Sequence, residues 1–262
     1  DKPLGEISLA VERGQKIGVI GSNGTGKSTL LKTITGLIPP LSGDVRFGVK
    51  TRVGYFDQTI AATKSELSVL EDFRAEFPEL NDGEIRKTLG GFLLSGDDVF
   101  KCVKDLSGGE KVRLALSKIF RRRPNFLILD EPTNHMDIIG KETLEKLLMD
   151  FSGTVIVVSH DRYLINRVAK SLIVFENGGV KYFDGTFDEY EEREKETAEE
   201  VAKEKPEKAK KTGGERYVES KEEARRKHRV EFLEKKITAL EEELSLAQAK
   251  LDDETVNTDY KK

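Results

Sequence analysis

The sequence predicts an α/β fold built on a mainly parallel core sheet. Three short apolar runs rich in branched residues, at 16–20, 126–129 and 155–158, have the composition of strands that are buried on both faces. Helical patterns accompany these runs, at 28–37, 108–122, 140–150 and 161–169. Because strands and helices alternate along the chain, we expect crossover connections between parallel strands.

Two further regions flank the predicted core. Apolar residues alternate with polar ones over 7–11 and again over 45–55. This period is typical of half-buried strands, so we expect an antiparallel β subdomain there, beside the parallel sheet. Residues 65–104 are rich in helical sequence with glycine-containing breaks, which predicts a helical subdomain over about 65–122 once the following helix is included.

The distribution of charge divides the chain into two parts. Residues 1–187 have the composition of one globular domain, whereas 41 of the 75 residues from 188 to 262 are charged. The second part has too few apolar residues for a core of its own. We therefore expect a charged helix and flexible linker over 188–221, followed by a coiled-coil arm over 222–262.

A regular apolar seam supports the coiled-coil prediction. Its members alternate in spacings of three and four residues, as in a left-handed coiled coil, and they are Val230, Leu233, Ile237, Leu240, Leu244, Ala247 and Leu251. The sequence stops at Lys262, just where a returning helix would begin, so we expect this arm to be truncated. The first residue is not methionine, which suggests a fragment of a longer protein.

Composition also excludes several classes of protein. No run approaches the roughly 18 apolar residues needed to cross a bilayer, and the first residues lack the apolar stretch of a signal peptide. A single cysteine, Cys102, excludes an internal disulfide and a cysteine-cluster metal site. We expect a cytoplasmic protein without a membrane segment.

Residues 21–28, Gly-Ser-Asn-Gly-Thr-Gly-Lys-Ser, carry a phosphate-binding pattern between a predicted strand and a predicted helix. The glycines let main-chain N–H groups converge on phosphate oxygens at the positive end of a helix dipole. Lys27 is expected to reach the β- and γ-phosphates of ATP, and Ser28 to place its hydroxyl on Mg²⁺. The predicted cofactor-binding residues are Asn23, Gly24, Thr25, Gly26, Lys27, Ser28 and Thr29.

Two acidic residues, Asp130 and Glu131, follow a predicted buried strand. Asp130 is expected to orient Mg²⁺ and its waters, and Glu131 to polarise the water that attacks the γ-phosphate. Two solvated acids at a strand end are the simpler interpretation of this pair alone. The phosphate loop elsewhere in the chain favours the catalytic one.

Further motifs resemble those of the ATP-binding cassette ATPases. Residues 106–110, Leu-Ser-Gly-Gly-Glu, are similar to the signature motif of that family, and Gln58 matches its Q-loop. Residues 134–137 match its D-loop, and His160 matches its switch histidine. The resemblance covers about residues 4–187. It implies a P-loop NTPase cassette that hydrolyses ATP to ADP and phosphate with Mg²⁺.

The resemblance also implies how the work is divided between residues. The implied catalytic residues are Glu131, His160 and Gln58, and the implied Mg²⁺ ligands are Ser28, Gln58 and Asp130. A second cassette would complete the site with the signature-motif residues Ser107, Gly108 and Gly109, which open a predicted helix and so present N–H groups to the γ-phosphate.

A lone cassette would thus hold two half sites. We expect slow hydrolysis unless the chain pairs with a second copy or with a missing cassette, and we expect His135 to tune that contact.

A narrower resemblance concerns residues 131–137, Glu-Pro-Thr-Asn-His-Met-Asp, which are similar to a segment of the F subfamily, soluble members that act on ribosomes. Met136 replaces the usual Leu, an apolar swap of similar volume. The aromatic residue that stacks on adenine in the family would precede Asp1. The chain is therefore similar to the second, C-terminal cassette of such a factor, in which ATP-dependent pairing of cassettes regulates translation.

Other functions are open at this stage. The chain would alternatively be the nucleotide-binding subunit of a membrane transporter, although the pair Asn134-His135 and the charged coiled coil argue against this. A DNA-repair or chromosome-structure ATPase would carry its coiled coil between the phosphate loop and the strand-end acids. A nucleotide-sensing module without turnover would not need both Glu131 and His160.

Residues 203–229 contain 11 Lys or Arg against 6 Asp or Glu. This stretch is either the solvated face of a charged helix or a contact to nucleic acid. The association of C-terminal extensions in the F subfamily with ribosomal RNA favours the second interpretation. Contacts to phosphates would make the affinity fall with salt.

Overall fold

The computed structural model describes residues 7–61, 65–176 and 179–203, and the described residues up to Ala202 belong to one compact unit. The predicted coiled-coil arm, the basic stretch beyond Lys203 and most of the predicted linker lie outside the described residues. No helix in the described part of the chain is long and apolar enough to cross a membrane.

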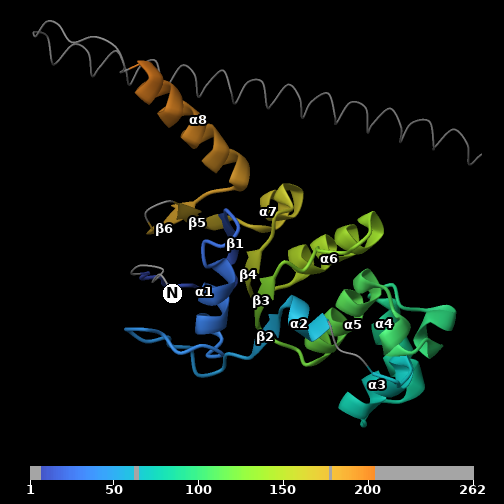
Figure 1. Ribbon diagram of the computed structural model, residues 1–262. Coiled ribbons are helices and arrows are strands. Elements are labelled where there is room, and N and C mark those ends of the chain that lie inside the picture. Colours follow the sequence, from blue (N-terminus) through green and yellow to red (C-terminus); the bar gives the residue numbers. More distant parts are fainter. Residues whose placement is uncertain (1–6, 62–64, 177–178, 204–262) are drawn as a thin grey trace, which may run out of the picture. The chain divides into compact units, whose positions relative to one another are not determined.

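A mixed sheet forms the centre of this unit (Figure 1). Its strands lie in the spatial order β2-β3-β4-β1-β5-β6, and all neighbouring pairs are parallel except β5 with β6. The strands span β1 Lys16–Gly21, β2 Val53–Phe56, β3 Phe126–Asp130, β4 Thr154–Val158, β5 Ser171–Glu176 and β6 Gly179–Asp184. The predicted fold class, with a mainly parallel core sheet, is confirmed.

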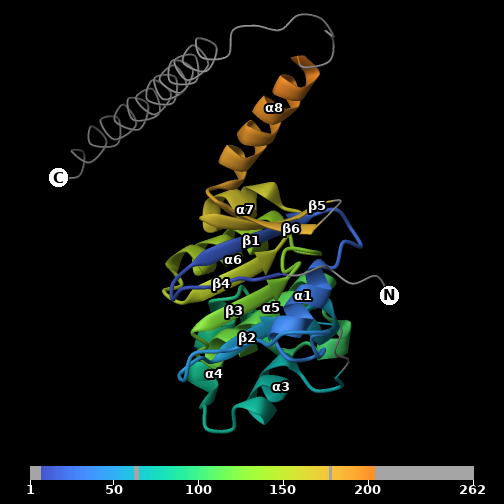
Figure 2. The ribbon, with the colours of Figure 1, turned by 90° about the vertical axis from the view of Figure 1, so that its left-hand side faces the viewer.

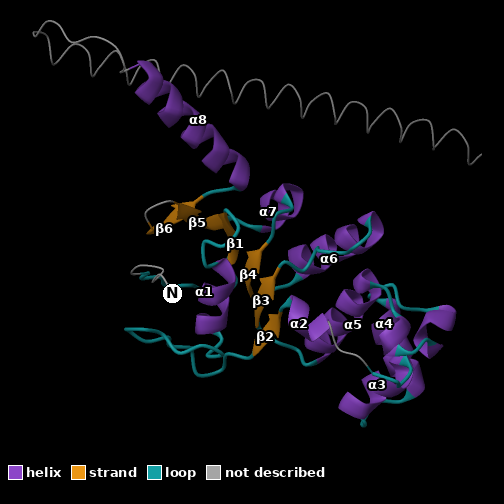
Figure 3. Cartoon of the chain, viewed as in Figure 1, coloured by secondary structure: helices purple, strands orange, loops and turns teal. Residues whose placement is uncertain are grey.

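Helices cover both faces of the sheet (Figure 3). They span α1 Lys27–Ile34, α2 Gln58–Ala61, α3 Val69–Glu76, α4 Asp82–Gly90, α5 Gly108–Arg121, α6 Ile138–Asp150, α7 Arg162–Val168 and α8 Phe187–Lys203. Two short 3₁₀ helices span Gly96–Phe100 and Val103–Asp105.

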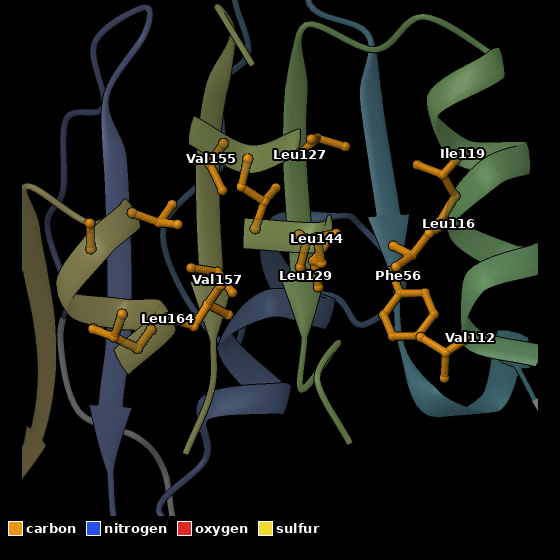
Figure 4. Packing of buried hydrophobic residues seen from close by; sticks show 14 of the residues in the cluster. Phe56, Val112, Leu116, Ile119, Leu127, Leu129, Leu144, Val155, Val157 and Leu164 are labelled. Carbon is orange, nitrogen blue, oxygen red and sulfur yellow. The ribbon is translucent and has the colours of Figure 1, made fainter. Parts of the chain in front are cut away.

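Alternate residues of the strands enter two separate cores. On one face, Phe56, Leu127 and Leu129 pack with residues of α5, α6 and α7 (Figure 4). On the other face, Ile128 packs with residues of α1, the helix in front of the sheet in Figure 2. Helices α1 and α5 therefore lie on opposite faces of the sheet. The residues at the start of α1 and those at the start of α5 therefore belong to helices in different layers of the fold.

The helical subdomain has a core of its own, centred on the fully buried Phe73, Ile85 and Leu89. Helices α3 and α4 each begin with a capping box, in which the N-cap side chain and the glutamate three residues later exchange hydrogen bonds with each other's backbone. Ion pairs from α3 to Lys118 and Arg122 attach this subdomain to α5.

The antiparallel strands lie elsewhere than predicted. Residues 7–12 and 44–48 form no strand, and Val53–Phe56 pairs in parallel with β3, whereas the antiparallel pair is β5 with β6. The apolar residues of 7–11 do pack against the α1-side core, but without ladder hydrogen bonds. The alternation correctly indicated half-burial there, yet it carries no information about the pairing partner.

Candidate functional site

The phosphate loop connects β1 to α1, and its glycines are needed for its shape. Gly24 and Gly26 have φ angles of 76° and 102°, in the left-handed region that favours glycine. At Gly21, φ is 145° and an added Cβ would lie 2.6 Å from the Cβ of Phe175. Gly26 is also the N-cap of α1, so the loop passes directly into the helix N-terminus.

Lys27, the first residue of α1, is buried, and its Nζ donates to the main-chain oxygens of Gly21 and Ser22, both at 2.8 Å. Burial lowers the pKa of Lys27, and the nearby charges of Glu131 and Asp130 raise it in part. The structure thus brings the lysine of the phosphate loop into electrostatic reach of both strand-end acids.

Asp130 and Glu131 diverge from the end of β3. Asp130 is 6% exposed, and its buried Oδ1 has no hydrogen-bond partner. Glu131 leaves the strand with a φ of 51°, while its N–H still donates to the oxygen of Val158 at 2.9 Å. At this φ angle the chain leaves the extended conformation of β3.

An orphaned carboxylate oxygen of this kind is suited to a cation. No group of three or more His, Cys, Asp or Glu side chains in the described ranges is arranged to hold a metal ion. Mg²⁺ bound through Asp130, the Ser28 hydroxyl and Gln58 would therefore take its remaining ligands from phosphate oxygens and water.

Glu131 and His160 face each other across the ends of β3 and β4. His160 Nε2 lies 3.4 Å from Glu131 Oε1, and the His160 N–H donates to Glu131 Oε2 at 3.3 Å. The Glu131 side chain is 14% exposed and that of His160 54%. A shielded carboxylate beside a solvent-facing imidazole can accept a proton from a water molecule and hold that water in place.

Gln58 is exposed at the start of α2, just after β2. Phe56 pairs with Leu129, so the end of β2 lies level with Asp130. The turn before Gln58 is held by Asp57, which accepts hydrogen bonds from Thr59 and from the Tyr55 hydroxyl.

Asp57 was not among the residues predicted from sequence. Burial would raise the pKa of Asp57, but its hydrogen bonds and the Lys32 ammonium at 3.8 Å hold it below the usual value. Only its place beside Gln58 signals this supporting role.

The signature motif opens α5. The Ser107 hydroxyl accepts the Glu110 N–H at 3.3 Å, and Glu110 accepts the Ser107 N–H at 2.7 Å, which forms a capping box. Burial opposes ionisation of Glu110, but the bonds to Ser107 and Lys101 lower its pKa to about 2. An added Cβ on Gly108 would lie 3.1 Å from the Cβ of His135. An added Cβ on Gly109 would lie 2.7 Å from the main-chain oxygen of His135.

The predicted site residues therefore form two groups. Lys27, Asp130, Glu131 and His160 come together at the ends of the parallel strands, with Gln58 beside them. Ser107, Gly108 and Gly109 lie with His135 at the start of α5, on the sheet face opposite α1.

Comparisons with known proteins identify the family and the fold of the chain. The family model described as "ABC transporter" matches residues 4–134. The chain is 47% identical over 196 residues to the putative ATP-binding protein YdiF of Bacillus subtilis, covering 75% of this chain and 30% of that protein. It is 40% identical over 196 residues to ABC transporter F family member 2 of Arabidopsis thaliana, covering 74% and 29%.

The chain thus spans about a third of the length of these relatives. Among solved structures, the chain is similar to a dimeric post-hydrolysis state of the ATP-binding cassette MJ0796 bound to ADP and Pi. The TM-score is 0.58 with 21% identity, over 69% of this chain and 90% of that one. At 21% identity, this similarity is evidence for the fold alone.

Proposed function

The chain belongs to the ABC transporter family of ATP-binding cassettes, which are ATPases, and we propose that it hydrolyses ATP. In this proposal it is one cassette of an F-subfamily factor that regulates translation on the ribosome. The observation that carries the proposal is the Glu131–His160 pair, set beside Lys27 at the ends of the parallel strands. Its relatives include a protein named as an F family member.

Phosphate binding is assigned to the loop and to Lys27. The loop N–H groups and the N-terminus of α1 attract the phosphates, and the Lys27 ammonium adds a full charge. That ammonium bonds to two loop oxygens, so it is held at the loop, and its burial favours a counter-charge.

The strand-end acids divide the chemistry. Asp130 offers its orphaned oxygen to Mg²⁺, with the Ser28 hydroxyl and Gln58 as further ligands, and the ion would neutralise phosphate charge. Glu131 takes the proton of the attacking water, and His160 orients that water and the γ-phosphate.

A second cassette completes the site. Helix α5 packs on the face opposite α1, which supports the proposal that Ser107, Gly108 and Gly109 of one chain serve the nucleotide of another. We further propose that this is the C-terminal cassette of a cytoplasmic two-cassette protein of the F subfamily. Residues 203–229 would then contact ribosomal RNA.

Mixing two inactive variants tests the shared site. Glu131→Gln removes the proton acceptor, and Ser107→Asp keeps a good helix cap while adding a negative charge that repels phosphate. Ser107→Asn is the matched control, because it caps the helix without charge.

Each inactive variant alone should show little turnover. Mixed before ATP is added, the two should recover about a quarter of the wild-type rate, since half of the dimers are mixed and each holds one intact site. No recovery, together with an active Ser107→Asn, would count against sites shared between chains.

The ribosomal role is tested by co-sedimentation. Glu131→Gln loaded with ATP should form a stable closed dimer and should pellet with ribosomes in a salt-dependent manner. Pelleting with membranes instead would favour the alternative, a transporter subunit.

A further inference from the structure

The main chain on both sides of His160 is held by two buried hydroxyl groups. Thr133 Oγ1 and Ser159 Oγ lie 3.0 Å apart, and the two residues are 5% and 6% exposed. Ser159 Oγ also accepts the Asp161 N–H at 3.0 Å. The peptide groups that flank His160 are thus tied to the chain that follows Glu131.

Asp161 makes a second attachment through its carboxylate. Its Oδ1 accepts the N–H groups of Tyr163 and Leu164 at 3.2 and 3.3 Å, which caps α7. Its Oδ2 accepts the ammonium of Lys141 at 3.1 Å. Burial opposes the charge on Asp161, but the bond from Lys141 and those from α7 lower its pKa, so the carboxylate stays ionised near neutral pH.

Lys141 comes from the segment that lies against the signature motif. It stands in the first turn of α6, where its N–H donates to the oxygen of Asp137 at 3.0 Å. Two residues earlier in the chain than Asp137, His135 closely approaches Gly108 and Gly109. A displacement of this segment would therefore move Lys141 and, through it, Asp161.

We propose that Lys141 is a positioning residue for His160, acting through its ion pair with Asp161. The ion pair connects the segment beside the signature motif to the residue that follows His160, so docking of a second cassette reaches the Glu131–His160 pair by this route. The inference rests on the proposed function, because it concerns the efficiency of the same site.

The solvent exposure of the Lys141–Asp161 ion pair indicates that it orients His160 rather than stabilises the fold. The side chains of Lys141 and Asp161 are 42% and 22% exposed, and ion pairs this close to solvent contribute little to folding. A misplacement of about 1 Å at a catalytic group can nonetheless slow a reaction many-fold. Loss of the pair should therefore affect turnover far more than the melting temperature.

The test compares Lys141→Ala with Lys141→Arg and with Lys146→Ala. Lys146 is an exposed lysine one and a half turns further along α6 and serves as the matched control. Lys141→Ala should lower kcat about tenfold with KM for ATP nearly unchanged. Arginine should restore most of the activity, since it can still pair with Asp161, and Lys146→Ala should behave as wild type.

A second readout does not depend on turnover. The chain has only three histidines, so the imidazole NMR resonance of His160 can be assigned with His160→Gln. At one fixed pH, Lys141→Ala should shift this resonance, whereas Lys146→Ala should not. Asp161→Asn, which retains a capping oxygen, should have effects that do not add to those of Lys141→Ala.

These outcomes separate the two proposals. A wild-type chain without turnover at any concentration would overturn the proposed function, and this inference with it. An active wild type with an unchanged kcat in Lys141→Ala would overturn only the role of Lys141. The same holds if kcat falls while the His160 resonance stays in place, or if arginine fails to restore activity.

Discussion

Among single residues, His160 combines an ionisable, exposed side chain with a position just after the buried strand β4. It follows a fully buried strand, yet its side chain is half exposed, with Nε2 3.4 Å from Glu131 Oε1. A side chain in this position can act on a bound ligand without carrying the fold. Its removal should therefore be visible in catalysis alone.

His160→Ala should lower kcat about 100-fold, in the range expected when a group that assists proton transfer is removed. Binding of ATP should change little, because the phosphate loop and Lys27 are untouched. Steady-state kinetics with ATP titration measures both, and the thermal unfolding curve of the variant controls for its fold. A matching loss of ATP affinity would contradict the assignment.

Gly109 is a residue whose missing side chain matters. An added Cβ would lie 2.7 Å from a main-chain oxygen of His135, which cannot turn aside as a side chain could. Gly109→Ala should lower the free energy of unfolding by about 1–3 kcal/mol, as for other overpacked sites.

Gly90→Ala is the control for that substitution. Gly90 ends α4, and an added Cβ there would meet open space, so alanine should be neutral or stabilising by up to about 1 kcal/mol. Denaturant unfolding of both variants gives the comparison. Equal effects would show that the contact with His135 is not what makes alanine unfavourable at Gly109.

At the level of elements, the start of α5 combines a structural cap with a predicted ligand site. Glu110 accepts the Ser107 N–H and receives the Lys101 ammonium at 3.2 Å, so it fixes the turn that precedes Gly108. These bonds favour its ionised form strongly enough to lower its pKa to about 2. The cap should therefore depend on pH.

The direction follows from linkage. The pKa of Glu110 is about 2 in the folded protein and 4.5 ordinarily, so its stabilising contribution is complete above pH 4.5 and is lost as the pH falls towards 2. The contribution is on the order of 3 kcal/mol, at 1.36 kcal/mol per pH unit. Urea unfolding of wild type and Glu110→Gln should differ most above pH 5 and converge near pH 2. Parallel pH profiles would contradict this.

The sequence predicted those elements that have a distinctive local pattern of residues. The runs 126–129 and 155–158 are apolar on both faces and became β3 and β4, and the phosphate pattern placed the start of α1 within a residue. Strands β5 and β6 were not predicted, and β2 was assigned to an antiparallel subdomain. Pairing depends on contacts between distant segments, which local alternation does not encode.

The same distinction holds within the site. Lys27, Asp130 and His160 were predictable because each belongs to a local pattern next to a strand end. The bond from the Tyr55 hydroxyl to Asp57, the bond between Thr133 and Ser159 and the bond from Lys141 to Asp161 were not predictable. The last two join residues at least 20 positions apart, which meet only because β3 and β4 are adjacent and α6 lies beside α7.

For the molecule as a whole, the helices that begin at the two groups of site residues pack on different faces of one sheet. Lys27 starts a helix that packs on one face, and Gly108 starts a helix that packs on the other. The two helix starts therefore belong to different packing layers. We expect one ATP to be enclosed by the first group of one chain and the second group of another.

Turnover per chain should therefore rise with protein concentration and reach a plateau once dimers dominate. Phosphate release measured over a wide range of concentrations at saturating ATP checks this. Ser107→Asp should remain low at every concentration, whereas the activity of Ser107→Asn should rise with concentration as that of the wild type does. A specific activity that is constant across the range would argue for a site complete in one chain.

The left-handed backbone of Glu131 has a consequence for evolution and for protein engineering. A residue with a branched or long side chain in that conformation destabilises the native state by about 1 kcal/mol or more, whereas asparagine adopts it readily. Glu131→Asn should thus yield a more heat-resistant protein that no longer turns over. Any screen that rewards only thermal endurance will enrich such dead variants, so heat resistance in this protein has to be selected together with activity.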